Sequence, residues 1–64
     1  MNKPLLTVQE VATYTGLSTH TLYTMVSQRR IPFVKLGGAL RFNPDHLEQW
    51  IKQNTVMPMP ERKH

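Results

Sequence analysis

The 64-residue sequence has no cysteine and few glycines, and it has half as many acidic as basic side chains. Without cysteine it can form neither a disulfide framework nor a thiolate metal site, which suits a reducing cytoplasm. No apolar run is long enough for a signal peptide or a membrane span, so neither is expected. A chain of this length can form one small domain, whose hydrophobic core is only just sufficient.

Acidic side chains are missing from the whole middle of the chain. No Asp or Glu occurs over positions 11–44. The same stretch holds Arg29, Arg30, Lys35 and Arg41. Together with a net charge of +4 and a pI near 10.0, this one-signed stretch favours a polyanionic partner.

The residues around Gly16 predict two helices joined by a tight turn. Thr7 and Glu10 match a capping box, and the apolar spacing predicts a first helix over residues 8 to 14 or 15. Gly16 can adopt the left-handed conformation that ends this helix, and Ser18 can cap the next one. Helix, glycine turn and helix in so short a segment are typical of a helix-turn-helix.

A β-hairpin is predicted after the second helix. That helix is expected to end near Gln28 or Arg29, because Pro32 forces extended backbone at the residue before it. Residues 33–36 and 39–42 have the composition of two strands, and the Gly-Gly pair between them predicts a tight turn.

Alternation along these strands predicts one apolar and one basic face of the hairpin. A two-stranded hairpin is unstable alone, so its apolar face must cover the helices. That face is expected to hold Val34, Leu36, Leu40 and Phe42. Lys35 and Arg41 are expected together on the opposite face.

A third helix is predicted from Pro44, with Asn43 as its cap. Its buried stripe is expected to hold Leu47, Trp50 and Ile51, with Trp50 as the anchor of the core. The pattern stops after Asn54. The sequence therefore predicts a mainly α fold with a small β-hairpin, a winged helix-turn-helix, over residues 1–54. Residues 55–64 are predicted to be a flexible tail.

The polar first turn of the second helix is the candidate recognition surface for duplex DNA. A recognition helix enters the major groove and presents short donors and acceptors to base edges. The alternative is a polar helix start that is simply solvated. The predicted recognition residues are Ser18, Thr19, His20, Thr21, Tyr23 and Thr24.

A second set of residues is predicted to contact the DNA backbone, where contacts set affinity and register. It comprises Gln28, Arg29, Arg30, Lys35, Gly37, Gly38 and Arg41. Two alternatives stay open. The arginines at the helix end can instead complement the helix dipole, and the hairpin can be only a tight turn rather than a wing.

No arrangement for catalysis or metal binding is recognisable. His20, His46 and His64 fall in different elements and share no ligand spacing. Ser18 and His20 point apart, so they cannot act as nucleophile and base. We therefore predict a protein that is not an enzyme and needs no cofactor or metal.

Short motifs spread along the chain form a combination far more specific than any one of them. They are Leu6-Thr7-x-x-Glu10-Val11-Ala12, Gly16-Leu17-Ser18-x-x-Thr21-Leu22-Tyr23, Ile31-Pro32, Lys35-Leu36-Gly37, Arg41-Phe42 and Leu47-x-x-Trp50-Ile51. Together they resemble the excisionase family of MerR-like winged helix-turn-helix proteins, over nearly all of the chain up to Asn54. The resemblance implies a recognition helix over Ser18 to Gln28 and a wing over Phe33 to Phe42.

The resemblance also implies a role. Members of the family are small phage or mobile-element proteins that bind and bend DNA at attachment sites and direct a recombinase towards excision. Others regulate transcription, which is the first alternative. Many relatives have glycine where Arg29 stands, so here the helix must end on a non-glycine residue.

The expected partners are double-stranded DNA and an integrase or recombinase, with no membrane involved. Longer MerR regulators continue into a dimerising helix that is not expected here, so we predict a monomer in solution that binds cooperatively on DNA. The expected location is the bacterial or phage-infected cytoplasm, at the nucleoid. An alternative of another class is a protein-interaction adaptor for a recombinase or polymerase.

Overall fold

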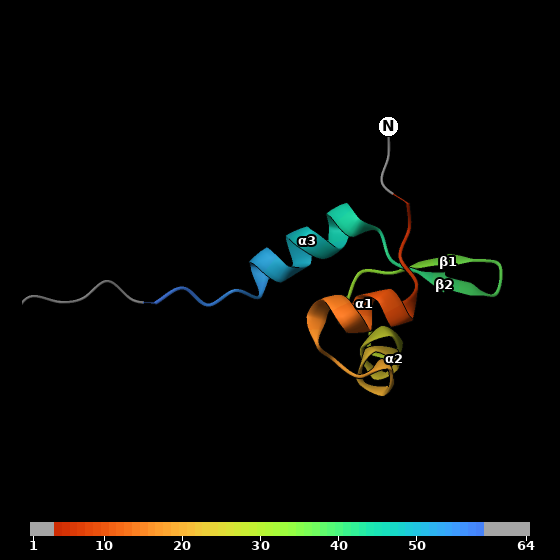
Figure 1. The fold of residues 1–64 in the computed structure, drawn as a ribbon, viewed down its shortest axis with the longest axis horizontal. Coiled ribbons are helices and arrows are strands. Elements are labelled where there is room, and N and C mark those ends of the chain that lie inside the picture. Colours follow the sequence, from red (N-terminus) through yellow and green to blue (C-terminus); the bar gives the residue numbers. More distant parts are fainter. Residues whose placement is uncertain (1–3, 59–64) are drawn as a thin grey trace, which may run out of the picture.

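The structure is a computed structural model that describes residues 4–58. Within these residues the chain forms three helices and one antiparallel two-stranded hairpin, the winged helix-turn-helix that the sequence predicts. The elements are α1 (Val8–Thr15), α2 (Thr19–Ser27), β1 (Val34–Leu36), β2 (Ala39–Arg41) and α3 (Pro44–Gln53). The helices α1 and α2 lie against each other, whereas the hairpin and α3 extend in opposite directions from them (Figure 1).

The predicted boundaries of α1 are confirmed, because both of its caps form. The Thr7 amide donates to Glu10 Oε1 at 2.8 Å, and the Glu10 amide donates to Thr7 Oγ1 at 3.2 Å. At the other end Gly16 has a φ of 78° and its amide donates to the Ala12 carbonyl oxygen at 2.8 Å. The capping box and the left-handed glycine thus fix where α1 begins and ends.

The turn to α2 is as short as the sequence indicates. Ser18 is the N-cap of α2, and its Oγ accepts a hydrogen bond from the Thr21 amide at 3.1 Å. Leu17 in the turn packs against the core. These contacts hold α2 at a fixed angle against α1.

The end of α2 is closed by a residue that is not glycine. Arg29 has a φ of 56°, and its amide donates to the Val26 carbonyl oxygen at 3.0 Å. The Arg30 amide donates to the Met25 carbonyl oxygen at 2.8 Å. This pair of hydrogen bonds is the Schellman motif, in which the left-handed position usually belongs to glycine.

The register of the hairpin corrects the predicted division of its faces. Leu36 pairs with Ala39, Lys35 with Leu40, and Val34 with Arg41. Directly paired residues of antiparallel strands project to the same side of the sheet. Lys35 therefore shares a face with Leu40, and Arg41 lies on the other face.

The predicted apolar face was wrong for β1. Phe33, Leu40 and Phe42 belong to the hydrophobic core or pack against it, while Leu36 is 55% exposed. The reason is the two-residue Gly37-Gly38 turn, which fixes the pairing across the hairpin. Alternation along each strand by itself does not show which residues of the two strands are paired.

The structure contains one strand-like contact that the sequence does not predict. Leu6 forms an isolated bridge with Phe42, in which each residue donates its amide to the other's carbonyl oxygen, at 2.8 and 2.9 Å. The segment before α1 thereby lies beside the end of β2.

The core is small. Its buried side chains are Val8, Val11, Leu22, Ile31, Phe42 and Leu47. Trp50 is not the central anchor that the sequence predicts, because it is only half-buried at the margin of this cluster. Its indole Nε1 donates to the Arg30 carbonyl oxygen at 2.9 Å, which ties α3 to the segment that follows α2. The largest fully buried side chain is that of Phe42.

The third helix begins as predicted. Asn43 Oδ1 accepts from the Asp45 amide at 2.8 Å and from the His46 amide at 3.3 Å, with Pro44 in the first turn.

After Asn54, residues 55–58 form no helix or strand. The rest of the predicted tail, residues 59–64, lies outside the described residues. No helix between residues 4 and 58 has the length and apolar content that a membrane crossing requires.

Candidate nucleic-acid interface

The N-terminal half of α2 presents a polar surface. His20, Thr21, Tyr23 and Thr24 are exposed, while Leu22 on the opposite side of the helix is completely buried. Of the other predicted recognition residues, Ser18 is exposed and Thr19 is half-buried. The core contact of Leu22 thus fixes which side of α2 faces outward.

Several hydroxyl groups on this surface are oriented by local hydrogen bonds. Ser18 Oγ accepts from the Thr21 amide and also lies 3.0 Å from Thr21 Oγ1, to which it donates. Thr24 Oγ1 donates to the His20 carbonyl oxygen at 3.1 Å. A hydroxyl that has given its proton to the backbone presents its oxygen outward as an acceptor. The surface of α2 therefore offers an acceptor at Thr24, while Thr21 Oγ1, which accepts from Ser18, keeps its own proton to donate.

The basic end of α2 extends this surface. Gln28, Arg29 and Arg30 are all exposed. Arg30 Nη1 donates to Gln28 Oε1 at 3.0 Å, so the two side chains lie together. Two adjacent guanidinium groups at a helix end are suited to contacts with phosphate oxygens.

The hairpin carries one cation on each face. Lys35 is exposed on the face of Leu40, and the half-buried Arg41 lies on the opposite face. Arg41 Nη1 donates to the Leu40 carbonyl oxygen at 2.7 Å, which holds the guanidinium against its own strand. The tip is Gly37-Gly38, with Gly37 at a φ of 61°. The prediction that both cations project from one face was wrong.

A groove of about 480 Å³ joins α2 to the hairpin and to the start of α1. Of the predicted contact residues, it brings together Tyr23 from α2 with Lys35, Gly38 and Arg41 from the hairpin. The remaining predicted residues do not line it. They are Ser18, Thr19, His20, Thr21, Thr24, Gln28, Arg29, Arg30 and Gly37.

Sequence reasoning missed two polar residues of this groove. Thr7 and Gln9, at the start of α1, line it as well. The sequence indicates Thr7 only as a helix cap. The position of Gln9 relative to its neighbours does not distinguish it from an ordinary solvated residue. The groove holds two cations and no acidic side chain, so its walls suit a polyanion.

The arrangement defines a class of protein: a small winged helix-turn-helix domain with a basic, polar surface on its second helix and hairpin. Residues 5–55 match a family model described as a helix-turn-helix domain. The chain belongs to this family of small excisionase-like DNA-binding domains. Comparison with curated proteins and with solved structures gives no match.

Membership of this family establishes the coarse function. The chain is a DNA-binding helix-turn-helix protein, of a family that is typically non-enzymatic. Across residues 4–58, no three side chains of His, Asp or Glu gather in the way that a metal site requires.

Proposed function

We propose that this protein is a recombination directionality factor of the excisionase type. It binds and bends duplex DNA at attachment sites, so that a separate site-specific recombinase acts towards excision. The observation that carries the proposal is the groove that Tyr23 of α2 lines together with Lys35 and Arg41 of the hairpin. The family of excisionase-like domains supports the same role.

In this proposal α2 lies in the major groove and reads base edges. His20, Thr21 and Thr24 are exposed along the side of the helix that faces away from Leu22. Hydroxyl and imidazole groups can donate to or accept from base edges, and the thymine methyl can pack against a threonine methyl. Ser18 and Thr19 start the same surface, and Tyr23 connects it to the hairpin.

The hairpin acts as a wing. Lys35 and Arg41 start from opposite faces of the hairpin and both line the groove beside α2, so a wing that enters the minor groove brings both charges to the sugar-phosphate backbone. The minor groove is only about 6 Å wide, and the small Gly37-Gly38 tip suits so narrow a space. Arg29 and Arg30 contact phosphates beside the recognition helix. Such contacts set affinity and register rather than sequence preference.

One module of this size buries little DNA surface, so specificity requires several copies on adjacent sites. We propose that the protein is a monomer in solution, binds cooperatively on DNA and contacts an integrase there. The compartment that fits this role is the cytoplasm of a bacterium, at the nucleoid or on phage DNA. A small transcriptional regulator is the alternative with the same fold.

Salt-dependent binding to duplex DNA tests the interface. We expect Arg30→Ala and Arg41→Ala each to weaken binding to all duplexes and to lower the slope of log affinity against log salt by about 1. Lys52→Ala is the matched control, because Lys52 is an exposed cation at the end of α3 and should leave the slope unchanged. His20→Ala should instead change which sequences are selected from a random duplex pool.

Equal slopes for all three cation variants would contradict the proposed interface. The role is tested separately, by the genes beside the coding gene and by end-to-end fluorescence transfer on a short duplex. An adjacent integrase gene and a shortened end-to-end distance are expected of an excisionase. An unbent duplex and no integrase gene would favour the regulator. Unchanged DNA binding in all of these variants, with partner capture intact, would favour an adaptor.

A further inference from the structure

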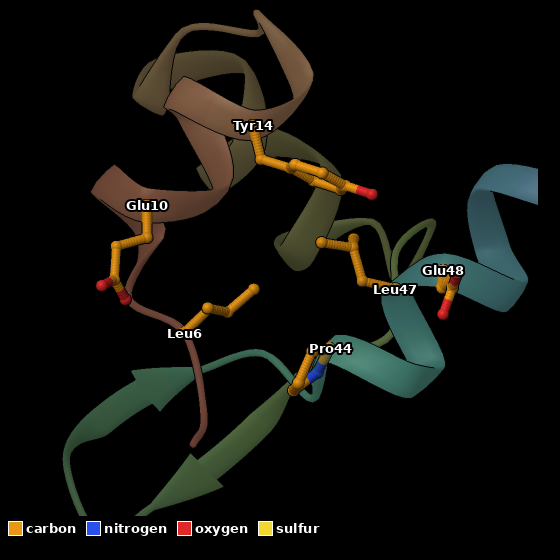
Figure 2. A pocket seen from close by; sticks show the side chains of 6 residues that line it. All are labelled: Leu6, Glu10, Tyr14, Pro44, Leu47 and Glu48. Atoms are coloured by element: carbon orange, nitrogen blue, oxygen red, sulfur yellow. The ribbon is translucent and has the colours of Figure 1, made fainter. Parts of the chain in front are cut away.

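A hollow between α1 and α3 has no role in the DNA interface described above. It has a volume of about 310 Å³ and is lined by Leu6, Glu10, Tyr14, Pro44, Leu47 and Glu48. Its centre is apolar, with Leu6, Tyr14 and Leu47 turned towards one another, and the two glutamates stand at its margins (Figure 2). None of the residues proposed to contact DNA lines it.

The apolar surface continues along α3. A second hollow, of about 530 Å³, lies towards the end of that helix and is lined in part by Leu17, Trp50, Ile51 and Thr55. Tyr14 lines both hollows and is 64% exposed. We call the two hollows together the α1–α3 groove. It is apolar towards the end of α3 and acidic towards its start.

The charge of this groove is opposite to that of the rest of the surface. The described residues contain three acidic side chains, Glu10, Asp45 and Glu48, and two of them flank the groove. The DNA surface holds the cations of α2 and the hairpin. A segment that fits the α1–α3 groove must therefore offer apolar side chains followed by positive charge.

The C-terminal tail of this chain has that order of residues. It begins with Val56 and Met57, which are 92% and 72% exposed. Met59, Arg62 and Lys63 follow in the sequence, with one acidic residue between them. After Thr55, which lines the groove, residues 56–58 run outward beyond the end of α3 (Figure 1). The apolar start of the tail is thus uncovered by its own domain.

We propose that the α1–α3 groove of one copy binds the C-terminal tail of a second copy. Val56, Met57 and Met59 pack over the apolar part beside Tyr14, and Arg62 with Lys63 lies against the glutamates. The 10 residues of α3 measure about 15 Å along the helix. Nine extended residues reach about 30 Å, so the tail is long enough to follow the groove.

The contact joins different surfaces of the two copies, so it leaves one groove and one tail open at the ends of a row. A single short segment binds weakly in free solution. Copies on adjacent DNA sites hold the tail near the next groove at high effective concentration, so the contact becomes substantial there. The inference goes beyond the proposed function, because the contact itself needs no DNA.

Mixed isotope labelling tests the contact directly. The natural chain has no cysteine, so His64→Cys creates a single position for a nitroxide spin label. The spin-labelled full chain is mixed, without DNA and at millimolar concentration, with a ¹⁵N-labelled full chain that carries no spin label. We expect the Tyr14 and Glu48 amide signals of the second chain to be lost, and those of His20 and Leu36 to persist.

Broadening that appears only when label and isotope are in the same chain would mean that the tail folds back on its own domain. That result, an absence of broadening, or broadening centred on α2 would each overturn the proposal. None of them bears on DNA binding, which the salt titration measures independently.

A pair of neighbouring substitutions supplies the matched control. Glu48→Gln and Gln49→Lys each add one unit of positive charge, but only Glu48 lines the α1–α3 groove, since Gln49 faces Pro32 and His46. We expect Glu48→Gln to weaken the self-association measured by broadening about two- to five-fold, as an exposed ion pair predicts, and Gln49→Lys to leave it unchanged. Glu48→Lys combined with Lys63→Glu should restore it. Equal effects of both single variants would overturn the proposal.

Discussion

At the scale of single residues, Arg29 shows a conflict between backbone and charge. It occupies the left-handed position that closes α2, with a φ of 56°. A residue with a Cβ adopts this conformation at a cost of roughly 1–2 kcal/mol. The same side chain is exposed at the basic end of α2, where it complements phosphate in the proposed complex. Folding and binding therefore favour different residues at this position.

Replacing this arginine should separate the two effects. We expect Arg29→Gly to raise the free energy of unfolding by about 0.5–1 kcal/mol, because glycine relieves the strain but loses more chain entropy. The same variant should bind duplex DNA more weakly, with a salt slope lower by about 1. Thermal unfolding and salt titration measure the two quantities.

Arg30→Gly is the control for this experiment, because the φ of Arg30 is not positive. It removes the neighbouring charge without relieving strain, so it should lower the stability. Equal changes in stability for the two glycine variants would contradict the role given to the left-handed conformation.

Single-residue signals account for most of what the sequence could predict. Thr7, Gly16, Ser18 and Asn43 each act through hydrogen bonds to residues no more than four positions away, or through their own backbone. Such local chemistry can be read from a few neighbouring letters. The starts of all three helices and the end of α1 followed from it.

At the scale of elements, the hairpin shows where prediction from neighbouring residues fails. The faces were assigned from alternation along each strand, but Gly37-Gly38 pairs Leu36 with Ala39 and so places Lys35 and Arg41 on different sides. The turn alone could have revealed this pairing. Two features could not be predicted, because they depend on how distant segments pack. They are the Leu6–Phe42 bridge and the position of Gln9 in the groove between α2 and the hairpin.

The turn can be tested with its two glycines. Both have open space where a Cβ would lie, but only Gly37 has a positive φ, at 61°. We expect Gly37→Ala to lower the free energy of unfolding by about 1 kcal/mol, because alanine is strained in the left-handed region. Gly38→Ala, the control, should change it by less than about 0.5 kcal/mol.

Chemical denaturation gives the stabilities of the two alanine variants. Binding to duplex DNA should weaken for Gly37→Ala if the wing contributes to the interface. A larger loss of stability for Gly38→Ala would contradict the left-handed conformation of Gly37 in this turn.

At the scale of the whole molecule, charge and packing divide the domain into two sides. Apart from Lys52 on α3, the cations of the described residues lie at the end of α2 and on the hairpin, while the acidic side chains lie on α1 and α3. A six-residue core connects the two sides, and Phe42 is its largest fully buried member. The domain therefore depends on one aromatic side chain at the junction of hairpin and helices.

Loss of that side chain should nearly unfold the protein. We expect Phe42→Ala to cost about 3–5 kcal/mol. A chain of 64 residues has a total stability of only about 3–10 kcal/mol at usual values per residue. Leu36→Ala is the control from the same hairpin, and it should cost much less because Leu36 is largely exposed. Circular dichroism during thermal unfolding compares them, and similar midpoints would contradict the core assignment.

The pairing of Leu6 with Phe42 has a consequence for any attempt to divide this protein. Those two backbone hydrogen bonds close the chain into a loop that contains both helices of the helix-turn-helix and the whole hairpin. A fragment that stops after α2 lacks the Leu6–Phe42 backbone hydrogen bonds and the buried ring of Phe42. We expect it to remain unfolded in isolation. The smallest part of this sequence that can fold and bind DNA by itself therefore includes the wing.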